Sequence, residues 1–151
     1  MKPLLVLIAA FLISLVGLEV FSGEWNYRLA GNIAMASMLL FTAIGHFAFT
    51  KGMTMMLPEV VPFKKELVYS TGVIEAAAAI GLLVNPLREM TAILLIIFFV
   101  LLLPANIHAA LKNVDYQKGT YDGQGLTYLW FRVPLQLFFI GWVVYFSLYN
   151  R

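Results

Sequence analysis

Residues 90–111 read MTAILLIIFFVLLLPANIHAAL, an apolar run that contains no Asp, Glu, Lys or Arg. A helix needs about 20 mostly apolar residues to cross the roughly 30 Å hydrocarbon layer of a bilayer. A membrane strand would instead show about ten residues of alternating polarity. Only a helix bonds all the backbone groups of such a segment internally. The run therefore predicts a transmembrane helix.

Four further apolar runs accompany this one. They are Pro3–Leu18, Leu29–Thr50, Leu67–Val84 and a run from about Tyr128 to Leu148. Two of these reach spanning length only by including one charge each, Glu75 and Arg132. The sequence thus predicts an all-α integral membrane protein with five transmembrane helices, and a tight turn at Asn85–Arg88 between the third and fourth.

The composition supports a lipid environment. Hydrophobic residues make up 62% of the 151 residues and charged residues 12%, whereas soluble domains carry about 25% charged residues. The net charge of +2, without a basic patch, argues against a nucleic-acid partner. The chain has no cysteine, which excludes thiolate metal sites and dithiol redox chemistry.

The first run allows two interpretations. Lys2 followed by the apolar Pro3–Val16 resembles a signal peptide, but no A-x-A-like cleavage site follows it. We therefore expect residues 1–22 to form an N-terminal transmembrane helix and residues 29–148 to form a four-helix membrane domain.

Basic residues indicate the orientation, because they concentrate in cytoplasmic segments. With five spans, six lysines fall on the side of the N-terminus and three arginines on the other side: Lys2, Lys51, Lys64, Lys65, Lys112 and Lys118 against Arg28, Arg88 and Arg151. The sequence predicts an N-terminus inside and a C-terminus outside.

Seven of the polar residues within the apolar runs are the candidate ligand-binding residues. They are His46, Thr71, Glu75, Asn106, His108, Arg132 and Gln136. An ionisable group in a spanning helix costs about 2.5–3.5 kcal/mol on insertion scales and usually faces the bundle interior. At about 1.5 Å of rise per residue, four of the seven fall roughly 6–8 Å below one surface and the others slightly deeper.

The polar layer supports three interpretations. Glu75 and Arg132 could form a buried pair that fixes helix packing, directly or through a bound ligand. The layer could instead be a ligand pocket. The third interpretation is a metal site formed by His46, His108 and Glu75. No helix offers a pair of metal ligands at i and i+4, so we expect no metal.

Two other features bear on packing and chemistry. Thr71, Gly72 and Glu75 share one helical face with Ala78 and Ala79, and small residues on such a face permit close helix contact. The methionines at positions 53, 55 and 56 suggest an apolar loop at the membrane interface rather than a copper site. The sequence contains no catalytic motif of the common enzyme classes, which argues against an enzymatic function.

Several motifs in series resemble the DoxX-like family of bacterial membrane proteins. They are Gly45-His46-Phe47, Met56-Leu57-Pro58, residues 67–75 (LVYSTGVIE), residues 85–88 (NPLR), residues 104–108 (PANIH) and residues 132–136 (RVPLQ). The resemblance implies a four-helix core in a bacterial cytoplasmic membrane, with Met1–Ser22 as an added helix. It also implies recurring polar positions at His46, Glu75, Asn106, Arg132 and Gln136.

The family takes its name from a subunit of an archaeal thiosulfate:quinone oxidoreductase, and other members are linked to oxidative-stress complexes. We therefore expect a small amphipathic or lipid-like ligand, with a quinone among the candidates, in an accessory subunit of a redox or stress-response complex. The expected surroundings are the lipid bilayer and a membrane or peripheral protein. The alternatives are a small transporter or permease, which should show broken helices, and a structural assembly factor, which predicts no pocket.

Overall fold

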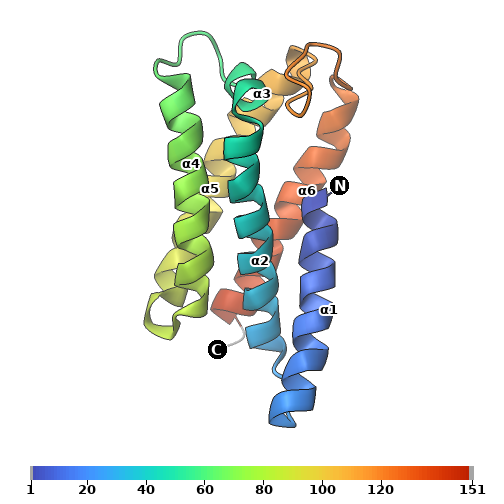
Figure 1. Cartoon of the computed structure of the whole chain (residues 1–151), viewed down its shortest axis with the longest axis vertical. Coiled ribbons are helices and arrows are strands. Elements are labelled where there is room, and N and C mark those ends of the chain that lie inside the picture. The colour runs from blue at the N-terminus through green and yellow to red at the C-terminus, as the bar shows by residue number, and fades with distance from the viewer. Residues whose placement is uncertain (1, 150–151) are drawn as a thin grey trace.

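The computed structural model describes residues 2–149, and these residues are mostly helical (Figure 1). The elements in chain order are α1 (Lys2–Ser22), α2 (Tyr27–Ala48), α3 (Thr50–Met55), α4 (Lys64–Leu83), α5 (Asn85–Leu111), α6 (Thr127–Val143) and the π-helix η1 (Val144–Tyr149).

Five helical segments are long and apolar enough to cross a membrane. They are α1, α2, α4, α5 and the continuous segment Thr127–Tyr149 formed by α6 and η1. The five predicted runs are confirmed as helices of this kind, with ends that differ by a few residues. Large apolar side chains such as Ile13, Ile44 and Leu101 are exposed on the outside of the bundle, as contact with lipid would require.

Two local predictions were wrong. The methionine-rich segment is the short helix α3 and its end rather than a loop. The segment Asn85–Arg88 is the first turn of α5 rather than a tight turn. Pro86 is tolerated there because the first N–H groups of a helix have no partner within it. The link between α4 and α5 is Val84, which is extended.

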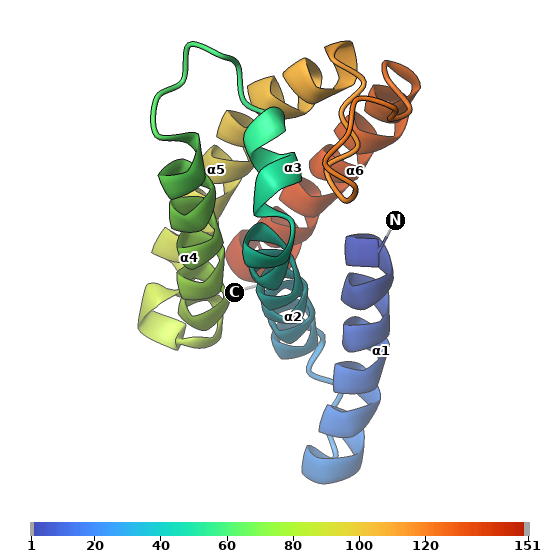
Figure 2. The same ribbon diagram turned by 45° about the horizontal axis from the view of Figure 1, so that its top comes forward.

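Helix α2 packs against both α1 and α4, and α5 lies between α4 and α6 (Figures 1 and 2). Leu7 is the one buried residue among those described in α1, so α1 is peripheral to the rest. Its Phe11 ring meets the Trp142 ring edge-on with centroids 5.2 Å apart.

The two ends of α2 are fixed in different ways. Near its start, the fully buried Asn32 donates to the Phe146 carbonyl at 3.0 Å and accepts from the Ser147 hydroxyl at 2.7 Å. Further along, Gly72 of α4 faces Ala43 and His46 of α2 closely enough that an added Cβ would lie 2.9 Å from the Cβ of His46. This approach of α4 to α2 positions the candidate site.

Candidate functional site

A cavity of about 670 Å³ lies among α2, α4, α5 and α6, and side chains of α3 and of the α5–α6 loop also line it. Six of the seven predicted site residues line this cavity: His46, Thr71, Glu75, Asn106, Arg132 and Gln136. The remaining surface is largely apolar, with contributions from Met38, Phe98 and Leu102 among others. An apolar cavity with a few converging polar groups is the usual form of a small-molecule site.

His46 connects α2 to α4. Its Nδ1 atom lies 3.1 Å from the Val68 carbonyl oxygen and 3.0 Å from the Thr71 hydroxyl. Its Nε2 atom lies 3.5 Å from Oε2 of Glu75. Gly72 makes these contacts possible, because a larger residue would hold the two backbones apart.

The contacts of His46 favour one tautomer of its ring. The Val68 carbonyl can only accept, and it also accepts from the Thr71 hydroxyl at 2.8 Å, so its contact with Nδ1 is a hydrogen bond in the tautomer that carries the hydrogen on Nδ1. In that tautomer Nε2 faces Oε2 of Glu75 at 3.5 Å, without a hydrogen bond between the two atoms.

Among the described residues that line the cavity, Glu75 has a buried side-chain oxygen that the fold leaves without a hydrogen-bond partner. The residue is 5% exposed, and its Oε2 atom is buried without a hydrogen-bond partner in the described part of the chain. The 3.5 Å contact with His46 is within ion-pair range but is not a hydrogen bond. Because unpaired buried oxygens are costly, Glu75 is where a ligand donor or acceptor would be most favourable.

Asn106 and Gln136 join α5 to α6. Gln136 donates through Nε2 to the Phe99 carbonyl, and Asn106 donates to Oε1 of Gln136 at 3.4 Å. Pro104 lacks an N–H and disturbs the hydrogen bonds of the preceding turn of α5. The missing N–H leaves the Val100 carbonyl without its usual donor, and Gln136 bonds the neighbouring Phe99 carbonyl while lining the cavity.

Arg132 lines the cavity, but no ion pair joins it to Glu75 or to another described carboxylate. The direct Glu75–Arg132 pair is therefore not formed. The reason is that α4 packs on α2 through Gly72, which turns Glu75 toward His46. A ligand-bridged contact between Glu75 and Arg132 stays a prediction.

His108 is the predicted site residue that does not line the cavity. Its Nδ1 atom lies 2.9 Å from the Met56 carbonyl oxygen, which attaches the end of α3 to α5. In residues 2–149 no three His, Asp or Glu side chains gather in a group that could hold a metal ion. The structure thus does not bring together the metal set of His46, His108 and Glu75.

Sequence reasoning missed several residues of the cavity. Lys2 from α1 and Tyr116 and Gln117 from the loop after α5 also line it. Tyr116 and Gln117 lie outside the apolar runs, so their positions could not be predicted from depth along a spanning helix. Lys2 precedes a run whose place in the bundle the sequence does not reveal.

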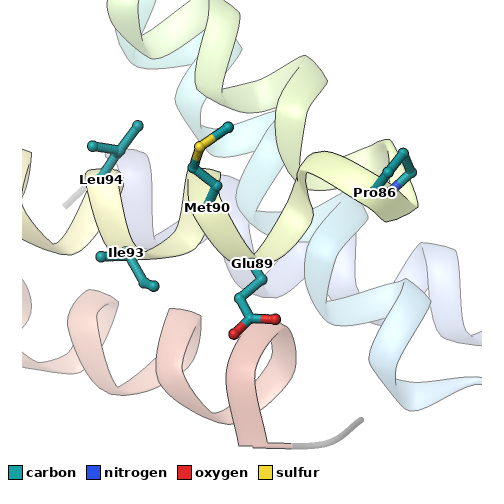
Figure 3. A pocket seen from close by; sticks show the side chains of 5 residues that line it. All are labelled: Pro86, Glu89, Met90, Ile93 and Leu94. Carbon is teal, nitrogen blue, oxygen red and sulfur yellow. The ribbon is translucent and has the colours of Figure 1, made fainter.

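A second, shallow depression of about 360 Å³ lies on α5 and is lined by Pro86, Glu89, Met90, Ile93 and Leu94 (Figure 3). All five residues come from one helix, and Glu89 points toward the C-terminal helix. Polar groups from separate elements do not converge there as they do in the larger cavity. The larger cavity is therefore the candidate site.

Residues 35–147 match the model of a protein family, DUF8561, that is described as a domain of unknown function. The match covers α4, α5 and α6 entirely and most of α2. No curated protein and no solved structure matches the chain. The resemblance to the DoxX-like family stays a prediction.

Proposed function

The chain belongs to the DUF8561 family, and we propose that it is an intramembrane binding protein for a lipid-like amphiphile with a hydrogen-bonding head. The head lies in the cavity beside His46, Glu75 and Arg132, and the tail lies along the apolar part of the wall. The observation that carries this proposal is the buried, unpartnered Oε2 atom of Glu75 in that cavity.

A quinone head fits these groups chemically. Its two oxygens lie on opposite sides of a flat ring, so one can meet Glu75 while the other meets Arg132. A quinol hydroxyl can donate to a Glu75 carboxylate, and a quinone carbonyl can accept from a protonated Glu75. Arg132 donates in either case. The ring and the start of a tail would meet apolar walls such as Phe98 and Leu102.

The two alternative functions receive less support. A structural assembly factor predicts no pocket, whereas the described residues enclose a cavity of about 670 Å³. A transporter should show unwound or broken helices at its site, but α5 and α6 continue through Pro104 and Pro134. A place in a redox or stress-response complex rests on the DoxX resemblance and is part of the proposal.

The proposal includes insertion into the cytoplasmic membrane of a bacterium, with the N-terminus inside. Single cysteines replacing Glu24 and Gln124 test this topology, since the chain has no native cysteine. Both residues are exposed, and they lie in the α1–α2 link and the α5–α6 loop. An impermeant maleimide should label them from opposite sides of the membrane. Labelling of both from one side would overturn the five-span topology.

Ligand binding tests the function directly. A decyl-tailed ubiquinone analogue, titrated against the protein in lipid nanodiscs, should bind saturably at one site. Glu75→Gln should weaken binding at least about tenfold, or 1.4 kcal/mol, because Gln lacks the second carboxylate oxygen that is left for the ligand. Glu66→Gln is the matched control, since Glu66 lies in the exposed first turn of the same helix. Absence of saturable binding to the wild-type protein would overturn the quinone proposal, and equal weakening in both variants would overturn the role of Glu75.

A further inference from the structure

We infer that the cavity opens sideways between α4 and α5, and that the apolar tail of the ligand leaves through this opening into the bilayer. This inference rests on the proposed function and adds the route and the shape of the ligand. It predicts a molecule with a polar head inside the bundle and a hydrocarbon tail that is partly outside it.

The end of the cavity near α3 is covered. Met53 and Met56 of the α3 segment and Tyr116 of the α5–α6 loop line the cavity there. The Met56 carbonyl contacts His108 of α5 at 2.9 Å. Gly52 of α3 lies against the backbone of Tyr116 so closely that a Cβ would overlap it. These contacts fix a cover over this end of the bundle, so the tail of a bound ligand must leave the cavity elsewhere.

The facing edges of α4 and α5 are apolar and reach the outside of the bundle. Ile74 of α4 is 48% exposed and Leu101 of α5 is 69% exposed, yet both line the cavity. Leu67 on α4 and Phe98 on α5 extend the same two edges. Since a residue that lines the cavity and is exposed on the outside must stand at an opening, the cavity reaches the surface between these helices.

The course of the two helices explains the opening. They are joined only by Val84, and Gly81 packs directly on Thr91 close to this hairpin. Figures 1 and 2 show α4 and α5 diverging from the hairpin toward the end where α3 lies. The opening therefore lies on the half of the bundle that carries the polar cluster.

A second edge of the cavity also reaches the outside, because Phe41 and Ile44 of α2 line the cavity and are exposed. The cavity is also lined by Lys2 and Pro3 in the first turn of α1. A lysine ammonium is a poor neighbour for a hydrocarbon chain because the charge favours water or a polar partner. The edges of α4 and α5 at the opening carry large apolar side chains and no charge. A tail is therefore more favourable between α4 and α5 than beside α1.

Blocking the opening with bulky residues tests the inference. Ile74→Trp and Leu101→Trp should each weaken binding of decyl-tailed ubiquinone about tenfold or more, and should leave binding of the tail-less ubiquinone head unchanged. Val73→Trp and Val100→Trp are the matched controls. They sit one residue away on the same helices, are exposed, and do not line the cavity. The control variants should bind both compounds as the wild type does.

A second measurement avoids any effect on folding. Leu101→Cys and Val100→Cys can be labelled with a bulky maleimide after the protein has folded, because the chain has no other cysteine. Labelling position 101, but not position 100, should weaken binding of the tailed compound. The opening would be overturned if labelling position 101 left binding of the tailed compound unchanged, or if labelling either position weakened it equally. It would also be overturned if labelling position 101 weakened binding of the tail-less head as much as binding of the tailed compound. Wild-type protein that binds neither compound would instead overturn the proposed function.

Discussion

Gly72→Ala lowers the thermal stability of the protein and weakens ligand binding, although alanine is the better helix former. A Cβ at this position lies 2.9 Å from the Cβ of His46 and 3.4 Å from the Ala43 carbonyl oxygen. Relieving this overlap requires α2 and α4 to separate, and overpacking of this kind costs about 1–3 kcal/mol. The gain from replacing glycine in a helix is at most about 1 kcal/mol. The overlap therefore dominates, and Gly72→Val should have the larger effect.

Gly141→Ala provides the control for this prediction. Gly141 lies in α6, and an added Cβ meets no atom within 4 Å. The same helix-forming gain is available there without an overlap, so thermal unfolding in detergent should show equal or higher stability. If Gly72→Ala were as stable as Gly141→Ala and bound ligand normally, the close packing of α2 on α4 would not position the site.

Much of the fold could be predicted from hydropathy alone. A run such as residues 90–111 admits only one way to satisfy its backbone in lipid, and the structure has α5 there. The short helix α3 could not be predicted, because its six residues are too few to show an amphipathic pattern. The methionines around it are compatible with a loop as well as with a helix.

Depth along the helices predicted which residues share a layer, and six of the seven candidates do line one cavity. Depth does not determine the direction in which a side chain points. His108 is at the depth of His46 but contacts the carbonyl of Met56. Arg132 is at the right depth for Glu75, yet Glu75 faces His46 because Gly72 brings α2 against α4. Helix-to-helix orientation of this kind requires the packed structure.

The contact between His46 and Glu75 has a measurable consequence without any ligand. The substitutions His46→Ala and Glu75→Gln each remove one member of a pair whose Nε2 and Oε2 atoms lie 3.5 Å apart. Their effects on the free energy of unfolding should be non-additive by about 0.5–3 kcal/mol, as for other residues in contact. Glu75→Gln and Arg132→Gln, by contrast, should be additive in the ligand-free protein, since no ion pair joins them. Additivity of the His46 and Glu75 substitutions would contradict the observed pairing.

The most direct test that Glu75 and Arg132 hold one head group is a double-mutant cycle. The stabilities of Glu75→Gln, Arg132→Gln and the double variant are measured again with ligand bound. At a free concentration of about 100 times its dissociation constant, a ligand stabilises the folded protein by about 2.7 kcal/mol. If each single substitution removes most of the stabilisation by the ligand, the double substitution removes little more of it. We therefore predict that the thermal-shift effects, additive without ligand, become clearly less than additive with saturating decyl-tailed ubiquinone. Effects that stay additive with ligand present would contradict a shared ligand site in the cavity.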